Sequence, residues 1–149
     1  MGIKISRKVV AFDTWQNDII IHPGYSLYIH YRDGEWNINP GKHGSKKYGP
    51  EGSEIVAQND GYPMLGEREG CLIGRLIYDT KIKNEGIRFE YPELNGESNQ
   101  KESILFTIGR EGLLIPKSDY PKKLSLRCND IDNGVFDNEG ELLLDIEIW

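Results

Sequence analysis

Alternation of apolar and polar residues with a period of two dominates this chain, and it predicts β-strands rather than helices. The alternation is clearest over residues 4–11, 18–22 and 25–31, and the third of these segments ends at Asp33-Gly34, a dipeptide that favours a tight turn. Further strands are expected at residues 71–80, 87–91, 103–108, 123–128 and 141–149. No segment shows the 3.6-residue period of an amphipathic helix.

The segments between these strands are rich in turn-forming residues. Residues 37–66 contain many Gly and Pro and predict a long loop region, and residues 92–102 are polar and turn-rich. About eight short strands with turn signals between them indicate an all-β fold, an antiparallel β-sandwich. The chain of 149 residues is expected to form a single domain over residues 1–149.

The charge of the chain limits the classes of partner. A net charge of −6 argues against a nucleic-acid-binding protein and favours cations. Arg7, Lys8 and Asp13 interrupt any signal-peptide segment, and no apolar run reaches transmembrane length. Cytoplasmic residence, or export by a non-standard route, is therefore expected.

Cys71 and Cys128 each lie in an apolar run and are expected to be buried thiols, since a bridge would require neighbouring strands.

Residues 128–140 carry the most distinctive chemistry, because they hold three Asp, three Asn and two Gly between apolar runs. Ca²⁺ takes about 6–8 oxygen ligands, so a short loop of this composition suits it. The spacing is not that of an EF-hand, because placing Gly134 at the sixth position puts Ile131, which cannot ligate, at the third. Two interpretations stay open: a β-sandwich calcium loop completed by another loop, or a solvated turn.

Short motifs follow one another along nearly the whole chain. They are Ile19-Ile20-Ile21-His22-Pro23-Gly24, Gly34-x-Trp36, Tyr48-Gly49-Pro50-Glu51-Gly52, Gly70-x-Leu72-Ile73-Gly74-Arg75-Leu76, Phe106-Thr107-Ile108-Gly109, and Asn129-Asp130 with Asp137-Asn138-x-Gly140. In this order they resemble the galactophilic PA-I-type (LecA-like) calcium-dependent bacterial lectins. The resemblance implies a jelly-roll-like β-sandwich of the galactose-binding type. It also implies carbohydrate binding through a Ca²⁺ ion that coordinates two sugar hydroxyls.

The resemblance also implies the residues of the calcium site. Asp130, Asp137 and Asn138 would supply side-chain oxygens, and Gly134 and Asn39 would supply backbone carbonyls. Five protein ligands leave about two coordination positions, which is room for a vicinal diol. Asp137 stands where the family has Asn, which keeps the oxygen and adds a negative charge.

A second sugar-contacting segment of the family, His-Pro-x-Gln, aligns with Tyr62-Pro63-Met64-Leu65. The sugar contacts implied are Tyr62, Pro63 and Leu65, together with Asp130 and Asp137. Both polar groups of the family segment are absent, and this argues against specificity for galactose. The ring of Tyr62 still offers an aromatic face on which a sugar can stack.

The altered segment 62–65 leaves an alternative function open, a non-lectin module for structure or protein interaction with a vestigial or purely structural calcium loop. An enzyme is not expected, and Glu54, Asp60, Glu67 and Glu69 are interpreted as solvated loop charges rather than a hydrolytic pair. The expected partners are galactosides or other glycans, without nucleic acid or membrane insertion. The resembled family forms tetramers, so a homo-oligomer that presents several weak sites together is also considered.

The remaining histidine and tryptophan residues have no recognisable ligand pattern. The histidines share no metal-ligand spacing, and they are interpreted as surface or packing residues: His22, His30 and His43. The tryptophans are interpreted as core or edge residues: Trp15, Trp36 and Trp149.

Overall fold

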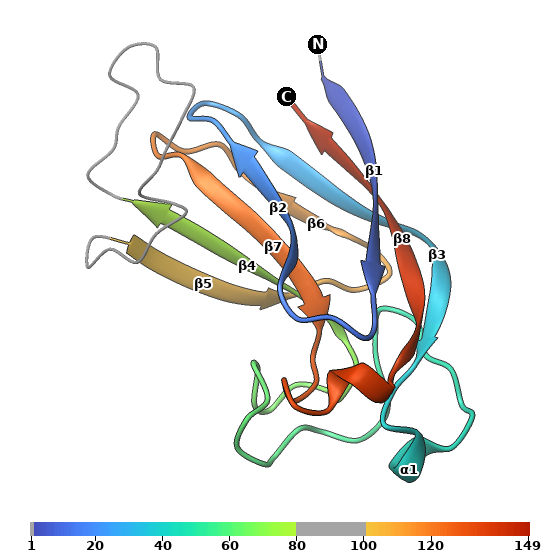
Figure 1. Ribbon diagram of the computed structural model, residues 1–149. Helices are drawn as coiled ribbons and strands as arrows, with labels where there is room; N and C mark the ends of the chain where they lie inside the picture. The colour runs from blue at the N-terminus through green and yellow to red at the C-terminus, as the bar shows by residue number, and fades with distance from the viewer. Residues whose placement is uncertain (1, 80–100) are drawn as a thin grey trace.

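The computed structural model describes residues 2–79 and 101–149, which form two antiparallel four-stranded sheets (Figure 1). The elements are β1 (Ile3–Val10), β2 (Gln16–Ile21), β3 (Leu27–Asn37), α1 (Pro40–His43), β4 (Leu72–Asp79), β5 (Lys101–Thr107), β6 (Leu113–Ile115), β7 (Lys122–Cys128), η2 (Val135–Asp137) and β8 (Glu139–Ile148). This confirms the expected all-β sandwich. Within the described ranges, no helix is long and apolar enough to cross a membrane. The predicted strand 87–91 and most of the polar segment 92–102 lie outside them.

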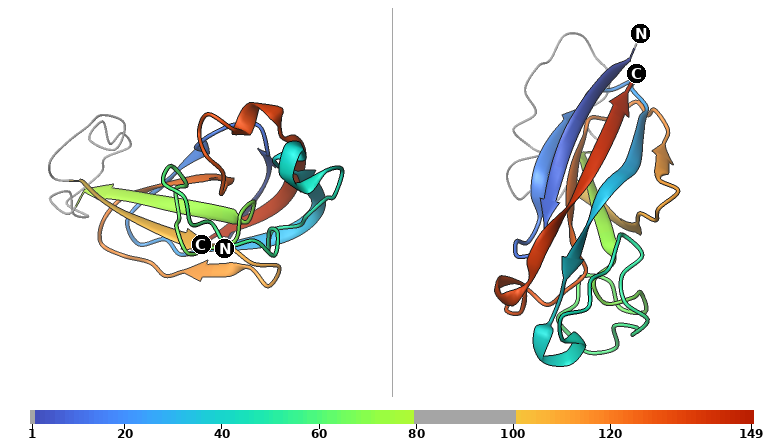
Figure 2. Two further views of the ribbon diagram at one scale, coloured as in Figure 1. Left: turned by 90° about the horizontal axis from the view of Figure 1, so that it is seen from below. Right: turned by 90° about the vertical axis from the view of Figure 1, so that its right-hand side faces the viewer.

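The order of the strands is that of a jelly roll. One sheet has the order β1-β8-β3-β6 and the other has the order β2-β7-β4-β5. Strand β1 therefore pairs with β8, β2 with β7, β3 with β6 and β4 with β5, as in a long antiparallel ribbon that has been rolled up. Ile3 lies opposite Ile148, so both termini lie at one end of the sandwich. Both α1 and η2 lie at the opposite end (Figures 1 and 2).

Inward-facing side chains of both sheets build one apolar core, as the period of two predicts. The residues that are entirely buried in it are Val9, Ala11, Leu27, Ile29, Trp36, Leu72, Leu124, Leu126, Cys128, Leu142, Leu144 and Ile146. Trp36 has its indole inside this core, and its Nε1 donates a hydrogen bond to the carbonyl oxygen of Gly70 at 2.8 Å. The polar atom of this large side chain is thereby satisfied, and β3 is tied to the loop that precedes β4.

Both cysteines are buried and free, as the sequence predicted. Their strands are neighbours, with Leu72 opposite Cys128, yet no bridge links the thiols. Burial raises the pKa of Cys71 and of Cys128, so both thiols stay protonated and behave as small apolar side chains.

Strand β3 differs most from its prediction. Asp33-Gly34 does not form a turn, because β3 continues through it to Asn37 with a register shift between Tyr31 and Asp33. Gly34 has a φ of 102°, and a Cβ there would collide with the carbonyl oxygen of Glu141 on the neighbouring strand. The Asp-Gly dipeptide therefore serves an irregularity inside a long strand rather than a hairpin. The three-residue strand β6 was not predicted.

Replacement of Leu126 by Ala should lower the free energy of unfolding by about 2–5 kcal/mol, because it leaves a cavity in a close-packed core. Leu126 is completely buried, whereas Leu114 on β6 is 52% exposed. Leu114→Ala is therefore the matched control, with an expected change within about 0.5 kcal/mol. Chemical denaturation of both variants measures the difference, and equal losses would contradict the placement of the core.

Candidate functional site

The segment that joins β7 to β8 crosses the end of the sandwich opposite to the termini (Figure 1). Arg127, at the end of β7, is 1% exposed and shapes the start of this segment. Its guanidinium donates hydrogen bonds to the carbonyl oxygens of Cys128 and Asp130 and to Oδ1 of Asp132, at 3.0, 2.7 and 2.6 Å. The Trp15 ring covers the Arg127 guanidinium, with the guanidinium carbon 5.5 Å from the ring centroid.

Asp130 is a buried carboxylate that no basic side chain contacts directly among the described residues, although the Arg127 guanidinium reaches its backbone carbonyl. It is 6% exposed, and none of the ion pairs among the described residues includes it. Its Oδ1 accepts a hydrogen bond from the Ile131 N–H and its Oδ2 accepts one from Nδ2 of Asn138, both at 2.8 Å. Burial raises the pKa of Asp130 and the charge of Asp137 raises it further, while the two hydrogen bonds and the charge of the nearby Arg127 offset only part of this effect.

Asn138 connects Asp130 to two other parts of the chain. Its Nδ2 also donates to the carbonyl oxygen of Ala11 at 3.1 Å, and its Oδ1 accepts a hydrogen bond from the Asn39 N–H at 2.9 Å. The side chain is 3% exposed. One amide therefore joins the β1–β2 turn, the start of α1 and the β7–β8 segment.

The sequence-predicted residues of the β7–β8 segment come together around Asp130. A Cβ added to Gly134 would lie 3.6 Å from Oδ1 of Asp130, so the Gly134 backbone passes close to the carboxylate. Asp137 is exposed at the end of η2, and its charge acts on Asp130. These residues are called the Asp130 cluster: Asp130, Gly134, Asp137 and Asn138.

Asn39 reaches the Asp130 cluster through its N–H. Its carbonyl oxygen accepts hydrogen bonds from the backbone N–H groups of Lys42 and His43, at 2.8 and 2.9 Å, because Asn39 is the N-cap residue of α1. Coordination of a metal by this carbonyl would compete with those two bonds. Asn39 also has a φ of 41°, a left-handed conformation that Asn tolerates better than most residues.

A hollow of ≈ 370 Å³ adjoins the cluster on the side of Asp137. It is lined by Asn37, Pro40, Gly44, Ser45, Lys47, Asp137 and Glu139. Two acids, a lysine and a serine are among the lining residues, whereas the Asn37 amide is already used, since its Nδ2 donates to the carbonyl oxygens of Gly44 and Lys46. Such a lining offers both donors and acceptors to a ligand that carries several hydroxyl groups.

The predicted second sugar-contacting segment lies beside the cluster but is largely committed to the fold. Asn129 fixes this segment by accepting a hydrogen bond from the Met64 N–H and donating one to the Met64 carbonyl oxygen, both at 3.0 Å. Tyr62 is 9% exposed, and its hydroxyl donates to Oε2 of Glu69 at 2.9 Å. Pro63 is half-buried, and Leu65 is 53% exposed. Tyr62 is therefore not an exposed platform on which a sugar can stack.

Glu69 corrects an expectation, because it is 3% exposed rather than a solvated loop charge. Nζ of Lys42 donates to its Oε2 at 2.8 Å, and Nε2 of His43 lies 3.2 Å from its Oε1. Nδ1 of His43 in turn lies 3.1 Å from the Tyr48 hydroxyl. His43 is thus a packing residue, as predicted. The Lys42 and His43 contacts hold α1, and with it Asn39, against the loop that carries Tyr62.

Hydrogen bonding controls the ionisation of the Glu69 network. Burial alone would raise the pKa of Glu69, but the hydrogen bonds from Lys42, Tyr62 and His43 outweigh this and hold the pKa below its usual value of 4.5. Burial and the bond to Glu69 raise the pKa of Tyr62, so its hydroxyl remains a donor. Glu69 and Asp130 therefore differ, since the Glu69 carboxylate contacts the Lys42 ammonium, whereas the Arg127 guanidinium reaches only the backbone carbonyl of Asp130.

The Asp130 cluster fits a hard divalent cation in its chemistry. It holds carboxylate, amide and carbonyl oxygens and no Cys or His, and the buried Asp130 carboxylate forms no direct ion pair with any described residue. No group of three His, Cys, Asp or Glu side chains forms a metal site in the described part of the chain, so amide and carbonyl oxygens would have to complete the shell. Asn138 turns Nδ2 toward Asp130, and coordination by both residues would require its amide to present Oδ1 instead.

Comparison of the chain with protein-family models, with curated proteins and with solved structures gave no match in any of the three. The fold alone therefore classifies this protein: it is an antiparallel jelly roll, and the loops at one end of the sandwich form a candidate site.

Replacement of Glu69 by Gln should lower the free energy of unfolding at pH 7 by about 1–3 kcal/mol, because a buried hydrogen-bonded charge is lost. The pKa of Glu69 is lower in the folded chain than in the unfolded chain, so the carboxylate stabilises the fold above pH 4.5. This contribution disappears as the pH falls below 4.5. The difference between wild type and Glu69→Gln should shrink accordingly in denaturation series at pH 7 and pH 3.

Glu67→Gln is the matched control for this experiment, since Glu67 lies two residues away and is exposed. Its stability should follow that of the wild type at both pH values. A loss in Glu69→Gln no larger than in Glu67→Gln would contradict the stabilising role of the network.

Proposed function

We propose that this domain binds carbohydrate through a calcium ion held by the Asp130 cluster. The observation that carries the proposal is the Asp130 carboxylate, which is 6% exposed, has no basic partner in direct contact and has a raised pKa. Burial of an unpaired charge is unfavourable unless a counter-charge arrives, so a cation would relieve this position. The carboxylate, amide and carbonyl oxygens of the cluster, without Cys or His, favour a hard ion such as Ca²⁺.

The neighbouring groups support a polyhydroxylated ligand. A bound Ca²⁺ ion would supply a hard cation to which two vicinal hydroxyls can coordinate. Asp137 belongs both to the cluster and to the lining of the hollow of ≈ 370 Å³, so a ligand at the ion that extends into this hollow would meet Lys47, Ser45 and Glu139. These side chains would orient the ligand by hydrogen bonds. The departures at residues 62–65 and the burial of Tyr62 support a sugar other than galactose.

A second candidate function is favoured by the segment 62–65. Its backbone is held by Asn129 and its Tyr62 hydroxyl by Glu69, so the segment acts as part of the framework. A β-sandwich that serves as a structural or protein-interaction module, with a structural calcium loop, would use it in this way. The two functions differ in whether any glycan binds.

Calcium titrated into chelator-treated protein should bind with a stoichiometry near one ion per chain in isothermal calorimetry. Asp137→Ala should weaken this binding by at least about tenfold, and because Asp137 is exposed the fold should be unaffected. Asp130→Ala should abolish it. Asp119→Ala is the matched control, since Asp119 is exposed in the loop between β6 and β7, and it should bind as the wild type. Absence of calcium binding in the wild type would contradict the proposed metal site.

A glycan array with the calcium-loaded protein decides between the two functions. The carbohydrate proposal expects binding to at least one class of glycan, loss of the signal with a chelator, and loss in Asp137→Ala. Calcium binding without any glycan signal would support the structural or protein-interaction module instead.

A further inference from the structure

Two phenylalanine side chains beside the Asp130 cluster are turned to solvent. Phe136 is 77% exposed and Phe12 is 52% exposed. Of the other two phenylalanines, Phe106 packs against the core and Phe89 lies outside the described residues. Free apolar surface of this size on a soluble domain commonly marks a binding site when it gathers in one place.

Both phenylalanines are held in position by the site itself. Phe136 lies in η2, immediately before Asp137 and two residues before Asn138. Phe12 follows Ala11, whose carbonyl oxygen accepts a hydrogen bond from Nδ2 of Asn138. The Ala11 N–H donates to the carbonyl oxygen of Gly140 at 3.0 Å, which fixes the same turn against the start of β8. Figure 1 shows η2 and the β1–β2 turn at the same end of the sandwich.

The fold does not require the Phe136 ring where it stands. Val135, its neighbour in η2, is 5% exposed and supplies the inward contact of this helical turn. The phenyl group at position 136 is left in water, where a polar side chain would be easier to accommodate. The ring is therefore free to contact a ligand that binds at the Asp130 cluster.

The charges around the two rings restrict what binds there. Asp13, Asp132, Asp137 and Glu139 are exposed and lie within four residues of one ring or the other. Carboxylates are depleted at the centres of protein interfaces, and they repel anionic lipid surfaces. A neutral sugar combines an apolar C–H face with a rim of hydroxyls, and it matches a phenyl ring surrounded by hydrogen-bond acceptors.

We infer that Phe136, assisted by Phe12, contacts the C–H face of a neutral glycan whose hydroxyls are held at the Asp130 cluster. The inference rests on the proposed function and names the residues that replace Tyr62 as the aromatic contact. It defines the ligand class as uncharged sugars that carry a vicinal diol next to an apolar face. Phe136 is thus a residue that determines specificity without contributing to the calcium shell.

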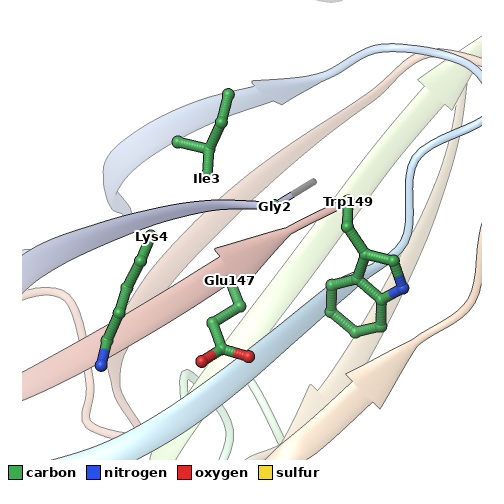
Figure 3. Close-up of a pocket in the computed structure, with 5 residues that line it drawn as sticks. All are labelled: Gly2, Ile3, Lys4, Glu147 and Trp149. Atoms are coloured by element: carbon green, nitrogen blue, oxygen red, sulfur yellow. The ribbon is translucent and has the colours of Figure 1, made fainter.

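A hollow at the opposite end of the sandwich is the competing place for a sugar. Its volume is ≈ 370 Å³ and it is lined by Gly2, Ile3, Lys4, Glu147 and Trp149. In Figure 3, the Lys4 and Glu147 side chains point the same way from adjacent strands and the Trp149 indole lies beside them. Trp149 is 47% exposed, so it is an exposed aromatic residue among polar groups, far from the Asp130 cluster. Trp149→Ala is therefore a matched control for loss of exposed aromatic surface.

The test compares Phe136→Ala, Phe136→Tyr, Phe12→Ala and Trp149→Ala in two titrations of the full chain. Calcium is titrated first, and then the best glycan of the array is titrated into calcium-loaded protein. Phe136→Ala should keep the calcium affinity within about twofold and weaken glycan binding roughly five- to tenfold. Phe136→Tyr should restore most of the affinity because it keeps a ring, Phe12→Ala should show a smaller loss, and Trp149→Ala should bind as the wild type.

The outcomes separate this inference from the proposed function. Chelator-sensitive glycan binding that neither phenylalanine variant weakens would overturn the inference alone, and a loss in Trp149→Ala would move the sugar to the hollow in Figure 3. Absence of glycan binding in the wild type would overturn both. Calcium-dependent association with phosphatidylserine–phosphatidylcholine vesicles, lost in Phe136→Ala, would instead assign the ring to membrane insertion and would also overturn the inference.

Discussion

The hydrogen bonds of the Asn138 amide are the interaction on which the candidate site depends. They connect the turn after β1, the residue before α1 and the carboxylate of Asp130, which are separated by about a hundred residues or more in two of the three cases. The rolled order of the strands makes this meeting possible, because β8 lies between β1 and β3 in one sheet. A single buried amide then extends this connection past the ends of the paired strands, to Ala11, Asn39 and the carboxylate of Asp130.

The two buried carboxylates of this end show how the same chemical group can be structural or available. Glu69 has Lys42, His43 and Tyr62 in direct contact, so its charge is balanced inside the protein. Asp130 has an amide and a backbone N–H instead, and neither carries a full positive charge. Burial therefore keeps the pKa of Asp130 raised despite the nearby charge of Arg127, whereas its hydrogen bonds hold the pKa of Glu69 low.

The sequence predicts what depends on local periodicity and misses what depends on distant partners. Alternation is sufficient for most of the long strands, because each has one face on the core. It fails at Asp33-Gly34, where the need for a residue without a Cβ arises from Glu141 on another strand. It also fails at Glu69, since Lys42 and His43 lie about 26 residues away and reach it only through the loop packing. The grouping of Asp130 with Gly134, Asp137 and Asn138 on one oxygen-rich loop was implied by the resemblance to a lectin family, whereas the burial of Tyr62 and the exposure of Phe136 were not predicted.

The neighbouring position of the two chain ends affects how the domain can be handled. Ile3 lies opposite Ile148 at one pole of the sandwich, and the β7–β8 segment crosses the other pole. A bead, chip or fusion partner joined to either terminus of the chain would leave the opposite end of the sandwich, which carries the β7–β8 segment, facing outward. Molecules grafted side by side in this way would all present the same face, and a branched polymer could then bridge several of them at once.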